Sequence, residues 1–175
     1  MRKEQTLTNW IDEYGQRLTR LAFSCVHDWA AAQDRVQDAF IKAYRSMEQL
    51  TNEERPFPWL AKIVINECKA SARTSWREVL TFYFPERAGS DTSLDDGYLK
   101  KEYYQTLHDA VLHLPPHYSA PVVLHYFEEL SIEDISKILG IRPGTVKSRL
   151  ARGREQLKNR MKEAMQHERT GSQTC

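Results

Sequence analysis

The sequence lacks the short motifs with which common enzyme classes hold a phosphate, a metal or a nucleophile. Its 175 residues contain no glycine-rich phosphate loop, no H-E-x-x-H and no G-x-S-x-G. The acidic pair Glu128-Glu129 is better explained as a turn at the end of a helix. We therefore expect a protein that is not an enzyme, with no catalytic residues and no cofactor.

Potential metal ligands are few and badly spaced. Four histidines lie near one another in sequence, but Pro115-Pro116 breaks the helix that would have placed them on one face. The cysteines are odd in number and lack a C-x-x-C spacing, and two of them occupy apolar helical positions. We expect buried thiols, neither ligands nor bridges, and no metal site. The residues are His108, His113, His117 and His125, with Cys25, Cys68 and Cys175.

Long hydrophobic runs are also missing. No apolar stretch approaches the roughly 20 residues that a helix needs to cross a bilayer. The first residues, Met1 to Glu4, lead into an amphipathic pattern rather than a signal peptide. A cytoplasmic protein without membrane insertion is expected.

Helical periodicity is what the chain contains in quantity. Apolar residues recur at three- and four-residue steps up to Cys25, and again from about Ala30 to Leu50, which predicts two amphipathic helices. Ile41 stands among charged residues on the outer face of the second helix, where chance exposure is more common than a partner surface. The predicted core residues are Leu7, Trp10, Ile11, Tyr14, Leu18, Leu21, Ala22 and Cys25 in the first helix, and Val36, Ala39, Phe40, Ala43, Met47 and Leu50 in the second.

A third helix is expected from near Pro58, after a proline-containing loop. Leu60, Ile63, Val64 and Cys68 would point inward. A polar stripe lies opposite them, and its pattern fits a nucleic-acid surface and a solvated face equally well. This stripe consists of Lys62, Asn66, Lys69 and Arg73.

The helical period is lost between Trp76 and about Glu102, where glycine, proline and acidic residues gather. Helices resume at Tyr104 and at about His117, and Pro121 predicts a kink unless it lies in a first turn. The polar residues after Met165 are expected to fray. We predict an all-α chain of two small helical domains, residues 1–76 and 103–165, with a flexible linker at 77–102 and a flexible tail at 166–175.

The stretch from Ser131 to Leu157 has the signature of a helix-turn-helix. Ser131, followed by Asp134, resembles a capping box, and Gly140 is placed to end the first helix. Pro143 suits the first turn of the second helix. Between Arg142 and Lys162 there are eight Lys or Arg residues against one acid, in a chain whose net charge is only +1. This local excess favours phosphate binding over a merely solvated basic helix.

The second helix of this motif divides into two faces. Val146, Leu150, Gly153 and Leu157 share an inner stripe, so the opposite face can enter a major groove. The candidate DNA-binding residues are Arg142, Thr145, Lys147, Ser148, Arg149, Ala151, Arg152 and Arg154.

Several of these segments, in this order, resemble the extracytoplasmic-function (ECF) sigma factors, which are small bacterial RNA polymerase specificity subunits. The resemblance covers nearly the whole chain. It is carried by Asp34–Phe40, Phe57–Ile63 with Asn66, Leu114-Pro115, Leu130–Ile135 and Gly144–Arg149.

The resemblance implies that residues 1–76 form sigma domain 2 and residues 103–165 sigma domain 4. The helix from Asp34 to Arg45 would dock on the clamp coiled coil of the polymerase largest subunit, through Asp34, Gln37, Asp38, Ile41 and Arg45. The stripe Lys62, Asn66, Lys69 and Arg73 would hold the minus-10 element and its flipped-out base. The basic face of the helix-turn-helix would read the minus-35 element.

The function implied is that of an alternative, stress-responsive sigma factor, with core RNA polymerase, promoter DNA and an anti-sigma factor as partners. The rival prediction is a stand-alone regulator, because a LuxR-type helix-turn-helix has a similar Ile-Ser-Lys-Ile-Leu and Thr-Val-Lys pattern. Such a regulator would have no need of the Val36-Gln37-Asp38 helix.

Overall fold

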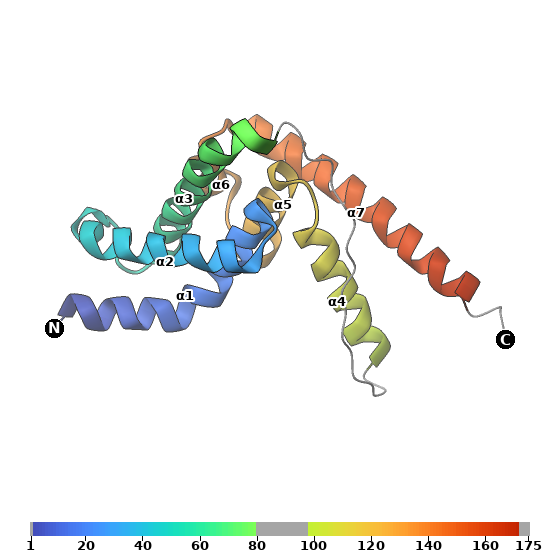
Figure 1. Cartoon of the computed structure of the whole chain (residues 1–175), viewed down its shortest axis with the longest axis horizontal. Helices are drawn as coiled ribbons and strands as arrows, with labels where there is room; N and C mark the ends of the chain where they lie inside the picture. The colour runs from blue at the N-terminus through green and yellow to red at the C-terminus, as the bar shows by residue number, and fades with distance from the viewer. Residues whose placement is uncertain (1, 80–97, 172–175) are drawn as a thin grey trace.

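The computed structural model describes residues 2–79 and 98–171, and within them every regular element is helical. The first three helices pack against one another (Figure 1). They are α1 (Arg2–Val26), α2 (Trp29–Ser46) and α3 (Pro56–Val79), with a short 3-10 turn, η1 (Met47–Gln49), after α2.

Local chemistry explains where these helices begin and end. His27 adopts a left-handed backbone conformation with φ of 55°, which ends α1. The carboxylate of Asp28 then accepts a hydrogen bond of 2.7 Å from the amide of Ala31, as an N-cap of α2. Pro56 occupies the start of α3, where its missing N–H costs nothing.

The apolar stripes of the three helices meet in one core. Leu18, Leu21, Leu60 and Val64 are almost completely buried, as expected. Ile11 is an exception, because 45% of it is exposed. The prediction that Ile11 belongs to the core was therefore wrong. Ile11 instead lines a groove on the surface of α1 and α2.

The second group of helices contains the helix-turn-helix. Its elements are α4 (Tyr98–Leu112), α5 (Pro116–Val122), the π-helical turn η2 (Val123–Phe127), α6 (Ile132–Leu139) and α7 (Pro143–Gly171). The predicted caps are confirmed. The hydroxyl of Ser131 accepts a hydrogen bond of 3.0 Å from the Asp134 amide, and Gly140 has φ of 67°.

Pro121 lies within α5, beyond its first turn. A proline there has no N–H to donate to the preceding turn. The helix continues as the wider π turn η2, in which the Glu128 amide donates to the carbonyl of Val123. The predicted irregularity therefore takes the form of a π turn immediately after Pro121.

The two groups of helices are in direct contact. α5 and α4 contact α1, and α6 contacts α3. In Figure 1, α4 and α7 extend away from this joint body as two arms. The helix-turn-helix therefore lies against α3 through its first helix, α6.

Several predicted boundaries need correction. α3 continues to Val79 and α4 already begins at Tyr98, so both ends of the expected linker are helical. Residues 166–171 were expected to fray but belong to α7. Most of the expected linker, residues 80–97, and residues 172–175 lie outside the described residues.

Candidate nucleic-acid interface and partner groove

The second helix of the helix-turn-helix, α7, has the two faces that its sequence predicts. Val146 and Leu150 are buried, whereas Lys147, Ser148 and Arg152 are exposed. Ala151 is exposed on the same face, and Arg142 precedes it at the turn. A hydroxyl and cations on an open helix surface can donate hydrogen bonds to base edges and phosphates.

Four residues predicted to bind DNA, Thr145, Ser148, Arg149 and Arg154, have contacts within the protein. Thr145 is half-buried and its carbonyl accepts from the Ser148 hydroxyl. Arg154 donates a hydrogen bond of 2.9 Å to the Tyr126 hydroxyl. Arg149 is half-buried and lines a cavity between the two groups of helices.

Close packing fixes the position of α7. Gly153 faces α5, and a Cβ atom at this position would lie 2.9 Å from Cγ2 of Val122. That distance is too short for a van der Waals contact, so only glycine permits the observed approach of the two helices.

The polar stripe of α3 is partly engaged. Lys62 and Asn66 are exposed, as a nucleic-acid surface requires. The ammonium group of Lys69, however, donates to the carbonyl of Leu139 at the end of α6. The side chain of Arg73 lies outside the described residues.

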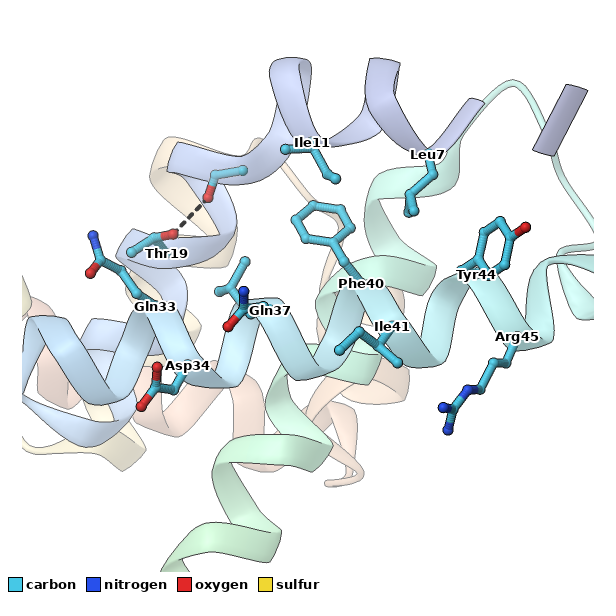
Figure 2. Close-up of a pocket in the computed structure, with 12 residues that line it drawn as sticks. Leu7, Ile11, Thr19, Gln33, Asp34, Gln37, Phe40, Ile41, Tyr44 and Arg45 are labelled. Carbon is cyan, nitrogen blue, oxygen red and sulfur yellow. Dashed lines mark hydrogen bonds between the residues drawn. The ribbon is translucent and has the colours of Figure 1, made fainter. Parts of the chain in front are cut away.

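A groove of about 890 Å³ runs between α1 and α2. It contains four of the five residues predicted to bind polymerase, namely Asp34, Gln37, Ile41 and Arg45. Figure 2 shows Phe40 and Ile11 facing the groove from opposite helices, with Asp34 and Arg45 far apart along α2. The remaining lining residues are Leu7, Gly15, Thr19, Gln33, Val36 and Tyr44.

Ile41, Ile11 and Tyr44 are exposed apolar residues of this groove, at 47%, 45% and 37%. Their shared position makes a partner surface a better explanation of Ile41 than chance exposure. Asp38 is not among the lining residues. Its carboxylate lies 3.4 Å from the guanidinium of Arg35.

Ionic contacts that the sequence analysis missed hold the two groups of helices together. Arg17 of α1 donates from Nε to Glu128 at 2.8 Å, and the Glu128 side chain is only 3% exposed. The Arg17 guanidinium also lies 4.4 Å from the ring centroid of Phe57. A weaker pair joins Arg55 to Asp134. Glu128 and Arg17 are 111 residues apart, and no local pattern signals such a pair.

Histidines also meet at this seam between the two groups. The rings of His27 and His113 are 6.2 Å apart. Burial, followed by the charge of His113, lowers the pKa of His27. Within the described part of the chain, no group of three potential ligands is arranged to hold a metal ion. The described helices also include none long and apolar enough to cross a membrane.

Comparison with known families identifies both groups of helices. Residues 10–78 match the model of Sigma-70 region 2, and residues 104–157 match the model of Sigma-70 region 4. The first match contains the polar stripe of α3 and all residues that line the groove except Leu7, and the second contains the helix-turn-helix. The three-helix group is hereafter called domain 2, and the group from α4 to α7 domain 4.

Relatives agree with these matches along most of the chain. The RNA polymerase sigma-H factor of Pseudomonas aeruginosa is 33% identical over 82% of this chain and 79% of its own length. The ECF RNA polymerase sigma factor SigW of Bacillus subtilis is 29% identical, with 87% of each chain covered. The sigma factor RpoE of Bartonella quintana, solved in complex with the anti-sigma factor NepR, superposes with a TM-score of 0.67 at 27% identity. That comparison covers 88% of this chain and 97% of RpoE.

The fold and the two family matches define a sigma factor of the sigma-70 class. Within that class, the chain belongs to the ECF RNA polymerase sigma factors. It is an alternative sigma factor that directs the initiation of transcription, and members of this family are initiation factors rather than enzymes. The rival prediction, a stand-alone regulator of LuxR type, is not supported.

Proposed function

We propose that the groove between α1 and α2 is the surface by which this sigma factor binds core RNA polymerase. The observation that carries this proposal is the gathering of Asp34, Gln37, Ile41 and Arg45 in one groove with exposed apolar side chains. Residues scattered along one helix thereby become a continuous surface with a second wall from α1.

The chemistry of the groove fits a helical partner. Its middle is apolar, with Ile11, Phe40 and Ile41, and its charged residues Asp34 and Arg45 are separated along α2 (Figure 2). A helix that presents an apolar stripe with flanking charges is a ligand of this kind. The family resemblance supplies the partner, the clamp coiled coil of the polymerase largest subunit.

Replacing Ile41 by Glu tests this proposal. A carboxylate at the centre of the groove would have to be desolvated on binding, so we expect the affinity for sigma-free core polymerase to fall at least about tenfold, or roughly 1.4 kcal/mol. The measurement is a titration of fluorescently labelled sigma factor with core enzyme.

A matched control is Met165→Glu, because Met165 is an exposed apolar residue of α7, far from the groove in sequence. It should bind core polymerase as the parent does. Equal affinities of Ile41→Glu and the parent would contradict the assignment of the groove.

We further propose that the exposed face of α7 reads the minus-35 element and that Lys62, Asn66, Lys69 and Arg73 serve the minus-10 element. The support for the first is the exposure of Lys147, Ser148, Ala151 and Arg152 on a helix whose opposite face is buried. The support for the second is the exposure of Lys62 and Asn66 on one side of α3.

These two roles require the domains to separate. The minus-35 and minus-10 elements are about 25 base pairs apart, or roughly 85 Å at about 3.4 Å per pair. Lys69 touches Leu139, and Lys147 follows Leu139 by eight residues, which span at most about 29 Å. We call the arrangement in which the two domains are in contact the closed state. In the closed state, the two surfaces cannot bind both promoter elements at once.

An anti-sigma factor is the further partner we propose. RpoE of Bartonella quintana, which covers most of this chain at 27% identity, was solved with the anti-sigma factor NepR. Such a partner would act where the polymerase is, in the cytoplasm. Competition between an anti-sigma factor and core polymerase for the labelled chain would test this role.

A further inference from the structure

A cavity of about 380 Å³ lies at the seam between domains 2 and 4. Domain 2 contributes two cysteines to it, Cys25 from α1 and Cys68 from α3, together with Lys69. The opposite wall comes from domain 4. Its residues are Pro116, His117, Ala120 and Pro121 of α5, Leu139 of α6, Ile141 of the turn, and Arg149 of α7.

The two thiols are neighbours on packed helices. α1 and α3 are in contact, and Cys25 and Cys68 line the same cavity, where each thiol shifts the pKa of the other. Cys25 is half-buried, whereas Cys68 is buried and only 4% exposed. A reagent that enters the cavity would therefore meet both cysteines on the same wall.

Their surroundings make the thiols chemically unequal. The Cys68 thiol lowers the pKa of Cys25 against the effect of burial, and Ser24 and Lys69 lower it further. The Cys25 thiol, together with burial, raises the pKa of Cys68. Cys25 is thus the better nucleophile, and Cys68 keeps its proton.

We propose that Cys25 and Cys68 form a redox-modification site at which hydrogen peroxide is reduced and a reversible intramolecular disulfide is formed. Two neighbouring cysteines that line one cavity, one of them partly exposed, resemble a redox-sensing cysteine with its resolving partner. In a reducing compartment, a disulfide of this kind is transient and regulatory, not structural.

The steps balance without a further reactant. The Cys25 thiolate attacks one peroxide oxygen, the O–O bond breaks, and the leaving hydroxide takes up a proton as water. The sulfur of Cys68 then attacks the resulting sulfenic acid of Cys25. The S–S bond forms, the S–O bond breaks, and the Cys68 proton leaves with the hydroxide as a second water.

Domain closure controls access to this site, because one wall of the cavity belongs to domain 4. The half-buried ion pair between Arg17 and Glu128 and the contact of Lys69 with Leu139 hold that wall in place. Separation of the domains removes the wall and exposes both thiols. The thiols should therefore be oxidised more slowly in the closed state than when the domains are separated.

The pair is tested in the full chain carrying Cys175→Ser, which leaves Cys25 and Cys68 as the two cysteines. After treatment with hydrogen peroxide, the intact mass should fall by two hydrogen atoms, with loss of both free thiols, and dithiothreitol should reverse the change. With Cys68→Ser added, the reaction should stop at a sulfenic acid that dimedone traps on Cys25. With Cys25→Ser added, Cys68 should remain reduced.

Two outcomes would overturn the proposal. One is that both thiols stay reduced in the folded chain and react only after denaturation, as inert buried cysteines do. The other is oxidation of Cys68 at the parental rate when Cys25 is serine. Circular dichroism of each variant checks that its helices remain folded.

Gating is tested with Glu128→Gln, which removes the charge at the seam. We expect disulfide formation to become severalfold faster. The matched control is Glu48→Gln, because Glu48 pairs with Lys3 within domain 2 and its side chain is 81% exposed. Identical rates for Glu128→Gln and Glu48→Gln would overturn the dependence on closure.

Discussion

Gly153 shows how a single residue sets the distance between two helices. A Cβ atom added there would lie 2.9 Å from a methyl group of Val122 and 3.6 Å from Cβ of Tyr118. The sequence places this glycine on the buried stripe of α7 but does not indicate which neighbour approaches it. That neighbour, α5, is irregular because of Pro121, so its path could not be drawn from helical periodicity.

Replacing Gly153 by Ala should therefore destabilise domain 4, even though alanine has the higher helix propensity. Propensity favours alanine by about 1 kcal/mol, and forcing an extra methyl group into a filled core costs about 1–3 kcal/mol. We expect a net loss of up to about 2 kcal/mol in the free energy of unfolding, measured by urea denaturation. Gly144→Ala has open space around its Cβ and serves as the control. A Gly153→Ala chain more stable than the parent would contradict the close approach.

His27 makes stability depend on pH. Its folded-state pKa is lowered by burial and by His113, and Arg160 contributes in the same direction. The unfolded chain therefore binds more protons below its ordinary pKa of about 6.5, and stability is lost as the pH falls through that value. Above it, the neutral ring costs nothing.

The test compares the parent with His27→Asn, because asparagine tolerates the left-handed backbone at this position. Unfolding free energies measured between about pH 7.5 and pH 5 should fall less steeply for His27→Asn. Parallel curves for the two chains would show that His27 carries no part of the dependence.

At the scale of the element, the helix-turn-helix was the most predictable part of the chain. Its signals are local: Ser131 caps α6, Gly140 ends it, and Pro143 begins α7. The groove between α1 and α2 was less predictable. In α2, Ile41 is an apolar residue among charged ones, which hinted at a partner surface. In α1, Ile11 has the helical spacing of a core residue. Only the packing of the two helices shows that Ile11 lines the groove and not the core.

The exposed face of α7 yields a specificity prediction. Arg152→Ala should weaken binding of the preferred minus-35 sequence by about 1–3 kcal/mol and reduce discrimination against altered bases there. The measurement is binding of the sigma–polymerase complex to a promoter and to its single-base variants. Lys158→Ala, a change of the same charge further along α7, should leave the base preference intact. If both variants lost the same affinity for every promoter sequence, Arg152 would contact only phosphates and would not read bases.

At the scale of the whole molecule, the sequence predicts two helical domains but not their contact. The seam depends on residues far apart in the chain, such as Arg17 with Glu128 and Lys69 with Leu139. Each of these cations also has an ordinary interpretation, as a surface charge or a DNA contact. The structure thus adds a closed state, in which part of the proposed minus-10 surface binds the end of α6.

The central claim is that the two domains of this sigma factor separate when it binds core polymerase. The most direct test is the distance between α3 and α6. The native cysteines are replaced by serine, and cysteines are introduced at the exposed positions Ala70 and Lys137. Fluorophores attached to these two cysteines report the distance by energy transfer. Transfer should be high in the free chain and should collapse when sigma-free core polymerase is added, as promoter elements roughly 85 Å apart require. Unchanged transfer in a complex that still makes promoter-specific transcripts would contradict the account.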